Sequence, residues 1–464
     1  MTSLTVEPTL LEKYATSAPR YTSYPTAVDW GSEFDPSSYP ARLSRAATRT
    51  TEPLSVYLHI PFCQEMCLFC GCNVVITRKQ EKVARYLDHL EHELEMIAAS
   101  NMSERPVRQY HWGGGTPTQL SCEEIERVQR AFEKTFEFAP GAEMAIEVDP
   151  RVTTTDQVQT LAGLGWNRIS MGVQDFDSTV QSAVKRVQSE EQTRLIVDAA
   201  RKADMPSVNI DLMYGLPHQT RASFARTVET IVDIRPERIA LFHYAHVPWM
   251  KRHQTALDVE AMPDPAEKIA IFIDTLGALQ QAGYVYIGLD HFALPTDELA
   301  QAVAEKRLHR NFMGYTTLRG TEMVSLGQSA IGEVDGAFVQ NAHNEADYLD
   351  GVAATGSAVF RGHELSPEDH LRRDVILSLM CNGEVDKQSI HESHGVDFDA
   401  HFADELQRLA PLEEDDLVER GADAIRLTSL GQLFMRNVAV EFDTYYANRR
   451  KRGEDGKRTF SKTL

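Results

Sequence analysis

Residues 54–72 read LSVYLHIPFCQEMCLFCGC, an apolar run that leads directly into four cysteines. The run at 56–62 combines β-branched and aromatic residues, the composition of a strand buried within a sheet. Similar short runs recur up to about residue 293, and each is followed by a polar turn and then a helical pattern. These further runs lie at 107–112, 144–148, 168–173, 208–214, 239–244 and 285–289.

The stretches between the runs have the periodicity of amphipathic helices. In the clearest, apolar residues recur at alternating spacings of four and three, which places them on one face of a helix. Strands that alternate with helices form right-handed parallel βαβ units. We therefore predict an α/β fold, a partial (β/α)6 TIM-like barrel, with a doubly wound sheet as the alternative. The stripe comprises Val83, Leu87, Leu90, Leu94 and Ile97, and further helical patterns begin near Cys122, Thr155, Glu190, Ala222 and Pro265.

The rest of the chain divides into three further segments. Residues 1–50 mix prolines with aromatic residues and are expected to form an N-terminal arm or cap on the partial barrel at 51–300. Residues 301–360 are expected to form a barrel-associated segment that connects to a mainly helical C-terminal domain at 361–464. Within that domain, the pattern at 417–427 indicates a hairpin followed by a helix, as in winged-helix modules.

The chain has 464 residues, with 47 Lys and Arg against 68 Asp and Glu, and a formal net charge of −21. Such a composition argues against a broad basic face for duplex nucleic acid, so an anionic substrate needs a local basic pocket. Residues 1–12 hold two Glu and no apolar core of a signal peptide, and no window reaches the ~18 apolar residues of a membrane span. We expect a cytoplasmic protein, with neither nucleic acid nor membrane as a partner.

Four of the six cysteines, Cys63, Cys67, Cys70 and Cys72, fall within ten residues in the pattern C-x3-C-x2-C-x-C. Zinc and iron–sulfur clusters both select thiolate ligands, and in a reducing compartment such a group indicates a metal site rather than disulfides. A closed zinc site usually pairs two C-x2-C halves about a dozen or more residues apart, and the sequence has no second half. Three close ligands therefore predict an iron–sulfur cluster with one iron open to a cofactor.

Residues able to carry chemistry stand at or just after the predicted strands. In a parallel barrel the carboxyl ends of the strands open on one face, where such folds place their active sites. We therefore expect one composite site rather than several unrelated ones. It would gather the cysteine loop, the glycine turn at 113–117, Glu147, Asp149, Gln174, Asp211 and residues 243–245.

Longer motifs give the chain a resemblance to a known family. C-x3-C-x2-C is the hallmark of the radical S-adenosylmethionine (SAM) enzymes. Together with six longer segments, it makes the chain similar to the oxygen-independent coproporphyrinogen III oxidases, from Tyr21 to beyond Tyr445. The segments are YLHIPFC at 57–63, HWGGGTPT at 111–118, IEVDP at 146–150, SMGVQDF at 170–176, NIDLMYGLP at 209–217 and LHRNFMGYTT at 308–317.

The resemblance implies a role for residues that match the family's motifs. Cys63, Cys67 and Cys70 would hold a [4Fe-4S] cluster whose open iron binds SAM. Cys72, Tyr57 and Phe312 match positions tied to activity, and Cys72 would not be a ligand. Two SAM molecules are implied. Contacts to the first match Tyr57, Gly114, Glu147 and Ile331, and contacts to the second match Phe69, Gly115, Thr116, Gln174, Arg186, Asp211 and Ala245.

The resemblance also implies the reaction and its partners. In this family a 5′-deoxyadenosyl radical removes hydrogen from the β-carbon of a propionate side chain, and loss of CO2 and one electron leaves a vinyl group. Two such steps convert coproporphyrinogen III to protoporphyrinogen IX in haem biosynthesis. An electron donor and an electron acceptor are implied, and a monomer is expected by family analogy.

The substrate carries four carboxylates, which basic residues must bind despite the acidic composition of the chain. Arg20 and Arg310 are the expected contacts, because a guanidinium group pairs well with a carboxylate. Tyr21 and Tyr24 are expected to lie against the macrocycle if the arm closes over it. Met313 stands where the family pattern leads us to expect glutamine, so this position lacks a polar group.

Two other functions are compatible with the cysteine motif. Haem-binding chaperones related to these enzymes retain the cluster motif, but they usually lack a cysteine at the position of Cys72 and generally lack the arm at 20–24. A different radical enzyme, such as a methyltransferase or a cyclopropanase, would be expected to differ in the segment at 309–317. These features favour the oxidase.

Overall fold

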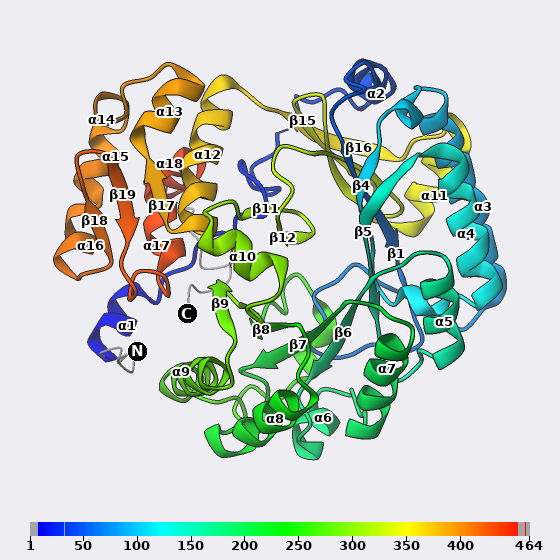
Figure 1. Ribbon diagram of the computed structural model, residues 1–464, viewed down its shortest axis with the longest axis horizontal. Coiled ribbons are helices and arrows are strands. Elements are labelled where there is room, and N and C mark those ends of the chain that lie inside the picture. Colours follow the sequence, from blue (N-terminus) through cyan, green and yellow to red (C-terminus); the bar gives the residue numbers. More distant parts are fainter. Residues whose placement is uncertain (1–7, 32, 453–459, 461–464) are drawn as a thin grey trace.

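The computed structural model describes residues 8–31, 33–452 and 460, and a curved twelve-stranded sheet lies at its centre (Figure 1). Six parallel strands of this sheet follow one another in chain order, as successive βαβ units require. They correspond to the first six predicted runs, so the partial barrel is confirmed. These strands are β1 (Leu54–Ile60), β4 (Val107–Gly114), β5 (Phe138–Val148), β6 (Arg168–Gln174), β7 (Ser207–Tyr214) and β8 (Arg238–His243).

The seventh predicted run forms β9 (Val285–Gly288), but it does not become a seventh parallel neighbour. It pairs antiparallel with β10 (His291–Ala293), which in turn pairs antiparallel with β8. Only Leu289 and Asp290 separate β9 from β10. Such a short connection can join antiparallel strands, whereas parallel neighbours need a crossover of about a dozen residues. This pair therefore forms one edge of the sheet.

Beyond β1 the sheet continues on its other side, through the segment at 301–360 that we expected to be a barrel-associated connection, and on to residue 364. β13 (Glu322–Leu326) lies parallel to β1, and three antiparallel strands follow it. These four strands are only four to six residues long and have no helices between the first three, so the strand–helix alternation did not reveal them. The three antiparallel strands are β14 (Ile331–Val334), β15 (Ala337–Asn341) and β16 (Val359–Glu364), and β11 (His309–Asn311) pairs separately with β12 (Gly314–Thr316).

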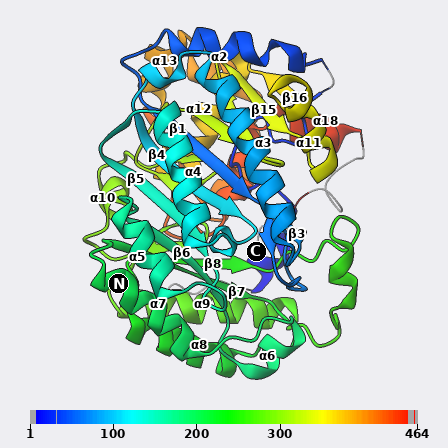
Figure 2. The ribbon, with the colours of Figure 1, turned by 90° about the vertical axis from the view of Figure 1, so that its right-hand side faces the viewer.

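Helices cover the outer face of the parallel strands (Figures 1 and 2). The predicted apolar stripe on α3 is buried against the sheet, as expected. Ser121 begins α4 with a capping box, in which its hydroxyl accepts a hydrogen bond from the Glu124 amide and the Glu124 carboxylate accepts one from the Ser121 amide. The covering helices are α3 (Gln80–Ala98), α4 (Cys122–Thr135), α5 (Thr155–Gly163), α6 (Ser178–Ala183), α7 (Glu190–Lys202), α8 (Arg221–Ile234) and α9 (Pro265–Gln281).

The chain after β16 is mainly helical and has its own apolar cluster. Three short strands form a small antiparallel sheet there, in which the predicted hairpin pairs β18 (Val418–Arg420) with β19 (Ala424–Leu427), and β17 (Glu384–Asp386) pairs with β19. We propose that the boundary of the C-terminal domain lies between β16 and α12. The remaining helices are α10 (Glu298–Ala304), α11 (Glu345–Thr355), α12 (Pro367–Asn382), α13 (Lys387–His394), α14 (Phe398–His401), α15 (Ala403–Arg408), α16 (Ala410–Glu414), α17 (Met435–Ala439) and α18 (Thr444–Lys451).

The N-terminal arm packs through α1 (Pro8–Tyr14) against this domain, whereas α2 (Tyr39–Ala47) packs into the core of the barrel. The rings of Tyr21 and Tyr24 are 1% and 0% exposed. Their hydroxyls lie 3.0 Å from a carboxylate oxygen of Asp443 and 3.0 Å from the hydroxyl of Thr444. We expected both rings against a bound macrocycle. Burial among the C-terminal helices fastens the arm to that domain, and a contact of these rings with the macrocycle stays a prediction.

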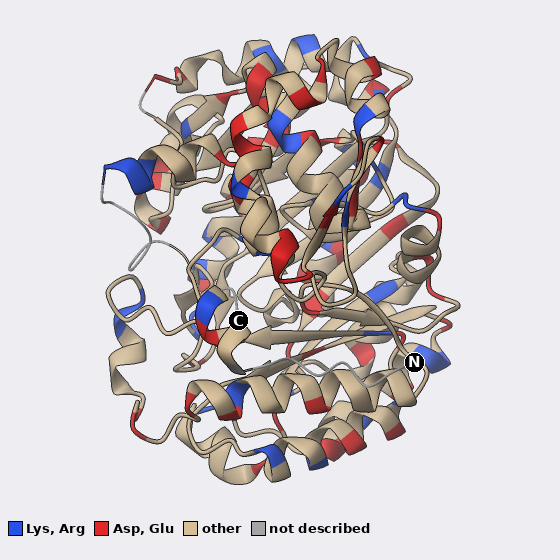
Figure 3. Cartoon of the chain, turned by 90° about the vertical axis from the view of Figure 1, so that its left-hand side faces the viewer, with Lys and Arg blue, Asp and Glu red and all other residues tan. Residues whose placement is uncertain are grey.

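Charged residues of both signs are interspersed over the helices in the view of Figure 3. Asp and Glu alternate there with Lys and Arg, so neither sign gathers into one patch in this view. Among the described residues, no helix combines the length and the apolar character needed to cross a membrane. Because the charges on this side of the molecule are mixed, we expect the basic groups that bind an anionic ligand inside the fold.

Candidate active site

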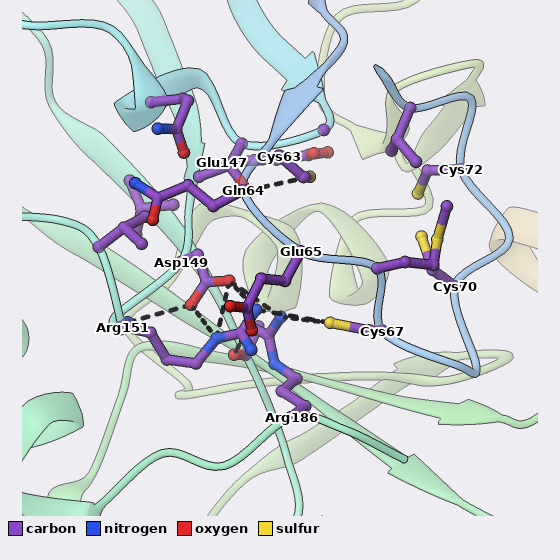
Figure 4. Close-up of a pocket in the computed structure, with 18 of the residues that line it drawn as sticks. Cys63, Gln64, Glu65, Cys67, Cys70, Cys72, Glu147, Asp149, Arg151 and Arg186 are labelled. Carbon is purple, nitrogen blue, oxygen red and sulfur yellow. Dashed lines mark hydrogen bonds and ion pairs between the residues drawn. The ribbon is translucent and has the colours of Figure 1, made fainter. Parts of the chain in front are cut away.

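The carboxyl ends of the parallel strands surround one cavity of about 550 Å3 (Figure 4). This volume is within the range of cofactor and small-molecule sites. The structure brings twelve of the predicted site residues together in its lining, from the cysteine loop, from the ends of β4, β5, β6 and β7, and from the turn after α6. They are Cys63, Cys67, Phe69, Cys70, Cys72, Gly114, Gly115, Thr116, Glu147, Gln174, Arg186 and Asp211.

Four of the residues predicted to bind the cofactors or to affect activity lie outside this lining, as do the four predicted substrate contacts. Tyr57 stands in the barrel, where its ring stacks on His111 with centroids 5.9 Å apart. Phe312 and Ile331 pack against an aromatic cluster between the arm and β15. The carbonyl of Ala245 accepts a hydrogen bond of 3.3 Å from a glutamine of the following loop. His111, which also contacts Glu147, was not among the predicted residues.

The cysteine loop leaves β1 through β2 (Phe62–Cys63) and returns through β3 (Val75–Ile76), which pairs with β2. Burial raises the pKa of the Cys63 thiol to about 11. The Cys72 thiol donates to Cys70, which lowers the pKa of Cys70 to about 6 and raises that of Cys72. The loop therefore offers sulfur ligands along one side of the cavity (Figure 4).

Cys63, Cys67 and Cys70 all border the cavity. Thiolates are the ligands of iron–sulfur clusters, and a space of about 550 Å3 can accommodate a [4Fe-4S] core beside them.

The glycine turn after β4 allows the backbone to approach the cysteine loop closely. Gly114 has a φ of +117°, and a Cβ there would lie 2.6 Å from the ring of His59. A Cβ on Gly115 would lie 2.5 Å from the carbonyl oxygen of Pro61. Side chains are excluded at both positions, and the amide of Gly115 donates a 2.8 Å hydrogen bond to the carbonyl of Ile60, so the turn is held against the cysteine loop.

Two carboxyl groups in the cavity differ in their protonation. Glu147 accepts a 3.1 Å hydrogen bond from the amide of Gly114 and lies 3.4 Å from a ring nitrogen of His111. Burial raises its pKa, but these contacts outweigh burial and hold the pKa below its usual value. Burial and the charge of Glu147 raise the pKa of Asp211 to about 7. Both groups are suitable acceptors for ribose hydroxyls.

Gln174 offers an unpartnered side-chain hydrogen-bond acceptor to a ligand. It adopts a φ of +70° at the end of β6, and its side-chain oxygen is buried without a hydrogen-bond partner. Buried polar atoms are nearly always satisfied, so such an atom in a cavity lining indicates a donor from a ligand. A nucleoside supplies donors of this kind.

Three residues, Asp149, Arg151 and Arg186, form a largely buried group of ion pairs that was not predicted from the sequence. Asp149 at the end of β5 pairs with Arg151 at 2.7 Å and with Arg186 at 3.1 Å. Arg151 lines the cavity, although sequence reasoning missed it. The signal was the Asp-Pro-Arg turn directly after a strand end, where a side chain two residues along can fold back onto the carboxylate.

A second group of cations lies outside the cavity lining, and we call Arg20, Arg310 and Arg436 the arginine group. Arg310 is 5% exposed, and its Nε and one Nη have no hydrogen-bond partner. Burial, followed by the charges of the other two, lowers the pKa of Arg20 to about 9. Burial and Arg310 also lower the pKa of Arg436 to about 10. Arg20 pairs with Asp290, and Arg436, which was not predicted, donates to backbone carbonyls of the arm.

The comparisons with known proteins agree with this site. Residues 57–231 match the Radical SAM superfamily, and residues 365–434 match the HemN C-terminal domain. The chain is 43% identical over 436 residues to the oxygen-independent coproporphyrinogen III oxidase of Escherichia coli, covering 94% of both chains. It is 40% identical over 446 residues to the enzyme of that name from Synechocystis sp., covering 95% of this chain and 96% of the other.

A solved structure extends the likeness to three dimensions. The coproporphyrinogen III oxidase (HemN) from Escherichia coli superposes with a TM-score of 0.90 and 40% identity, covering 96% of this chain and 100% of that one. The cofactors of this chain are accordingly a [4Fe-4S] cluster and SAM. Identity over nearly the full length, together with the cavity lined by cysteines and nucleotide acceptors, shows that the chain belongs to the oxygen-independent coproporphyrinogen III oxidases, a family of radical SAM enzymes.

Proposed function

We propose that this enzyme oxidatively decarboxylates two propionate side chains of coproporphyrinogen III to vinyl groups, giving protoporphyrinogen IX. The observation that carries this proposal is the identity of 43% along 94% of the chain to an enzyme named for that activity. The cysteine-lined cavity supports it, because the reaction needs the two cofactors that this cavity fits. We further propose a monomeric cytoplasmic enzyme that draws on an external electron donor and acceptor, with neither nucleic acid nor membrane as a partner.

Cys63, Cys67 and Cys70 would hold the cluster, with SAM on the iron that they leave open. When bound, the reduced cluster and SAM supply a 5′-deoxyadenosyl radical that removes hydrogen from the propionate β-carbon. The protein itself orients the cluster, SAM and the propionate relative to one another and excludes water from the site. The Cys72 thiol lies beside Cys70, and we propose that Cys72, Tyr57 and Phe312 are needed for activity.

Two patches of the lining support a second SAM molecule. Gly114 and Glu147 form one patch beside Tyr57, whereas Gln174 and Asp211 form another at the ends of β6 and β7. Each patch holds a carboxyl group able to accept ribose hydroxyls. The remaining residues matched to SAM contacts would extend these two patches: Ile331 the first, and Phe69, Gly115, Thr116, Arg186 and Ala245 the second.

The arginine group would bind substrate carboxylates. A buried guanidinium with unpartnered N–H groups is costly unless an anion completes it. Arg310 has such N–H groups, and besides burial the charges of Arg436 and Arg310 lower the pKa of Arg20, as the charge of Arg310 lowers that of Arg436. A substrate with four carboxylates supplies the anions that this part of the fold lacks.

An anaerobic assay tests the proposed function. The protein is reconstituted with iron and sulfide and then given SAM, dithionite and coproporphyrinogen III, while 5′-deoxyadenosine and tetrapyrrole products are followed together. Formation of protoporphyrinogen IX coupled to 5′-deoxyadenosine is the expected result. SAM cleavage without decarboxylation, together with tight haem binding, would contradict the proposal and indicate the chaperone function.

A further inference from the structure

Cys67 has different surroundings from its neighbouring cluster cysteine Cys63 (Figure 4). One Nη of Arg151 lies 3.4 Å from the sulfur of Cys67, and one Nη of Arg186 lies 3.6 Å from it. The sulfur of Cys63 instead faces the neutral hydroxyl of Thr116 at 3.5 Å. One ligand of the cluster is therefore placed against two cationic donors.

Asp149 holds these two guanidinium groups in place. Its carboxylate accepts 3.0 Å and 2.7 Å hydrogen bonds from Nε and one Nη of Arg151, and it pairs with Arg186 at 3.1 Å. The backbone amide of Arg151 donates to the same carboxylate at 3.0 Å. The side chain of Asp149 is only 8% exposed, so these contacts are shielded from solvent. Two guanidinium groups and one carboxylate leave a net positive charge beside Cys67.

The surrounding backbone fixes the same arrangement. Arg186 also donates a 2.6 Å hydrogen bond to the carbonyl of Gly172, where a Cβ would lie 3.0 Å from the guanidinium nitrogen. The amide of Leu68, next to Cys67, donates a 2.9 Å hydrogen bond to the carbonyl of Val184. This bond ties the cysteine loop to the segment that carries Arg186. The cationic contact is thus built into the fold.

The physical consequence concerns the electron that the cluster must accept. Adding one electron increases the negative charge on the cluster and on its thiolate ligands. N–H donors and positive charge at a ligand sulfur stabilise that reduced form, which raises the reduction potential. A guanidinium keeps its proton throughout the working pH range, so its contribution is constant. The formal charge of the whole chain is −21, and this overall negative charge opposes reduction.

We propose that Arg151 is a redox-tuning residue whose contact with Cys67, oriented by Asp149, raises the reduction potential of the cluster. Arg151 acts through Cys67, so it is a positioning residue and not a catalytic one. Arg186 shares the contact but also matches a SAM position, which makes Arg151 the cleaner residue to vary. The inference rests on the cluster chemistry of the proposed function and does not depend on the identity of the substrate.

The test measures the midpoint potential of the reconstituted holoenzyme by a redox titration followed by electron paramagnetic resonance. Arg151→Met removes both donor and charge, whereas Arg151→Lys keeps the charge without the planar donor. Arg78→Met is the matched control, because Arg78 is an exposed cation on the segment just after the cysteine loop and pairs with Glu65 at 2.6 Å. It removes the same charge near the loop without a contact to a ligand sulfur.

For Arg151→Met we expect the ratio of reduced to oxidised cluster at a fixed potential to fall about tenfold, a shift of about 59 mV to lower potential. Arg151→Lys should shift less, and Arg78→Met should stay close to the parent. Equal shifts in Arg151→Met and Arg78→Met would overturn the proposal. Loss of the cluster in both Arg151 variants would also overturn it, since it would make Arg151 a support of the loop. If the potentials shift as expected but the parent enzyme does not decarboxylate coproporphyrinogen III, the proposed function is contradicted and the redox proposal stands.

Discussion

The cofactor cavity and the arginine group are both buried and charged, but their charges are balanced in different ways. In the cavity, Glu147 accepts a hydrogen bond from the amide of Gly114, and Asp149 forms ion pairs with two guanidinium groups. In the arginine group, Arg310 retains N–H groups without partners although it is 5% exposed. We infer that the ion pairs of the cavity form without a ligand, and we propose that carboxylates of the substrate complete the arginine group.

The largest effect should come from replacing a cysteine ligand of the cluster in the cofactor cavity. Cys67→Ala removes one of three thiolates, so we expect no stable cluster, no SAM cleavage and no product. Iron content, the absorbance of the cluster and 5′-deoxyadenosine formation measure this. Cys122→Ala, at the start of α4, is the control and should retain all three. A Cys67→Ala enzyme with a full cluster would mean that the ligand set is misassigned.

The next effect should come from the arginine side. Arg310→Met removes a buried, partly unpaired cation, so we expect the KM for coproporphyrinogen III to rise about 10-fold to 100-fold, from about 1.5–3 kcal/mol per charged hydrogen bond. SAM affinity should be unchanged. The melting temperature of the ligand-free protein should rise, because an uncompensated buried charge is lost. Arg307→Met, at an exposed cation paired with Glu305, should change neither KM nor melting temperature. An unchanged KM for Arg310→Met would remove this residue from the substrate site.

The opposite response is expected where the buried charges are already balanced. Asp149→Asn keeps the shape of the side chain but leaves Arg151 and Arg186 without their carboxylate. We expect the free energy of unfolding of the ligand-free protein to fall by about 3 kcal/mol, as when one partner of a buried pair is removed. Denaturant titration measures this loss. If Asp149→Asn and Arg310→Met changed stability in the same direction, the contrast between the two regions would be wrong.

The smallest expected effect is a pH dependence of SAM binding. Burial and the charge of Glu147 raise the pKa of Asp211 to about 7, so Asp211 is a carboxylate above this pH and a neutral acid below it. Protonation removes the charged acceptor for a ribose hydroxyl, and SAM affinity should therefore weaken, roughly tenfold, as pH falls from 8 to 6. Calorimetric titration of the cluster-loaded protein measures this. In Asp211→Asn the affinity should be weaker and independent of pH over the same range. A parallel pH dependence in the variant would assign the titration to another group.

The sequence by itself determined the parts of the protein that depend on local spacing. Short apolar runs predicted β1 and β4 to β8, and helical periodicity predicted the helices that cover them, because these patterns span only a few residues each. Parallel topology then placed the strand ends on one face. The cysteine spacing indicated the iron–sulfur cluster, and the longer motifs indicated the enzyme family, because both are local features of the sequence.

Only the tertiary structure decided which distant residues meet. It added β13 to β16 to the sheet, turned Tyr21 and Tyr24 toward the C-terminal helices, and brought Arg436 to Arg20 and Arg310. It also directed Arg151 onto both Asp149 and Cys67. None of these contacts has a local pattern, because each depends on how elements far apart in the chain pack together. Local periodicity therefore fixed the elements and the cofactor loop, whereas long-range packing selected the partners of the buried charges.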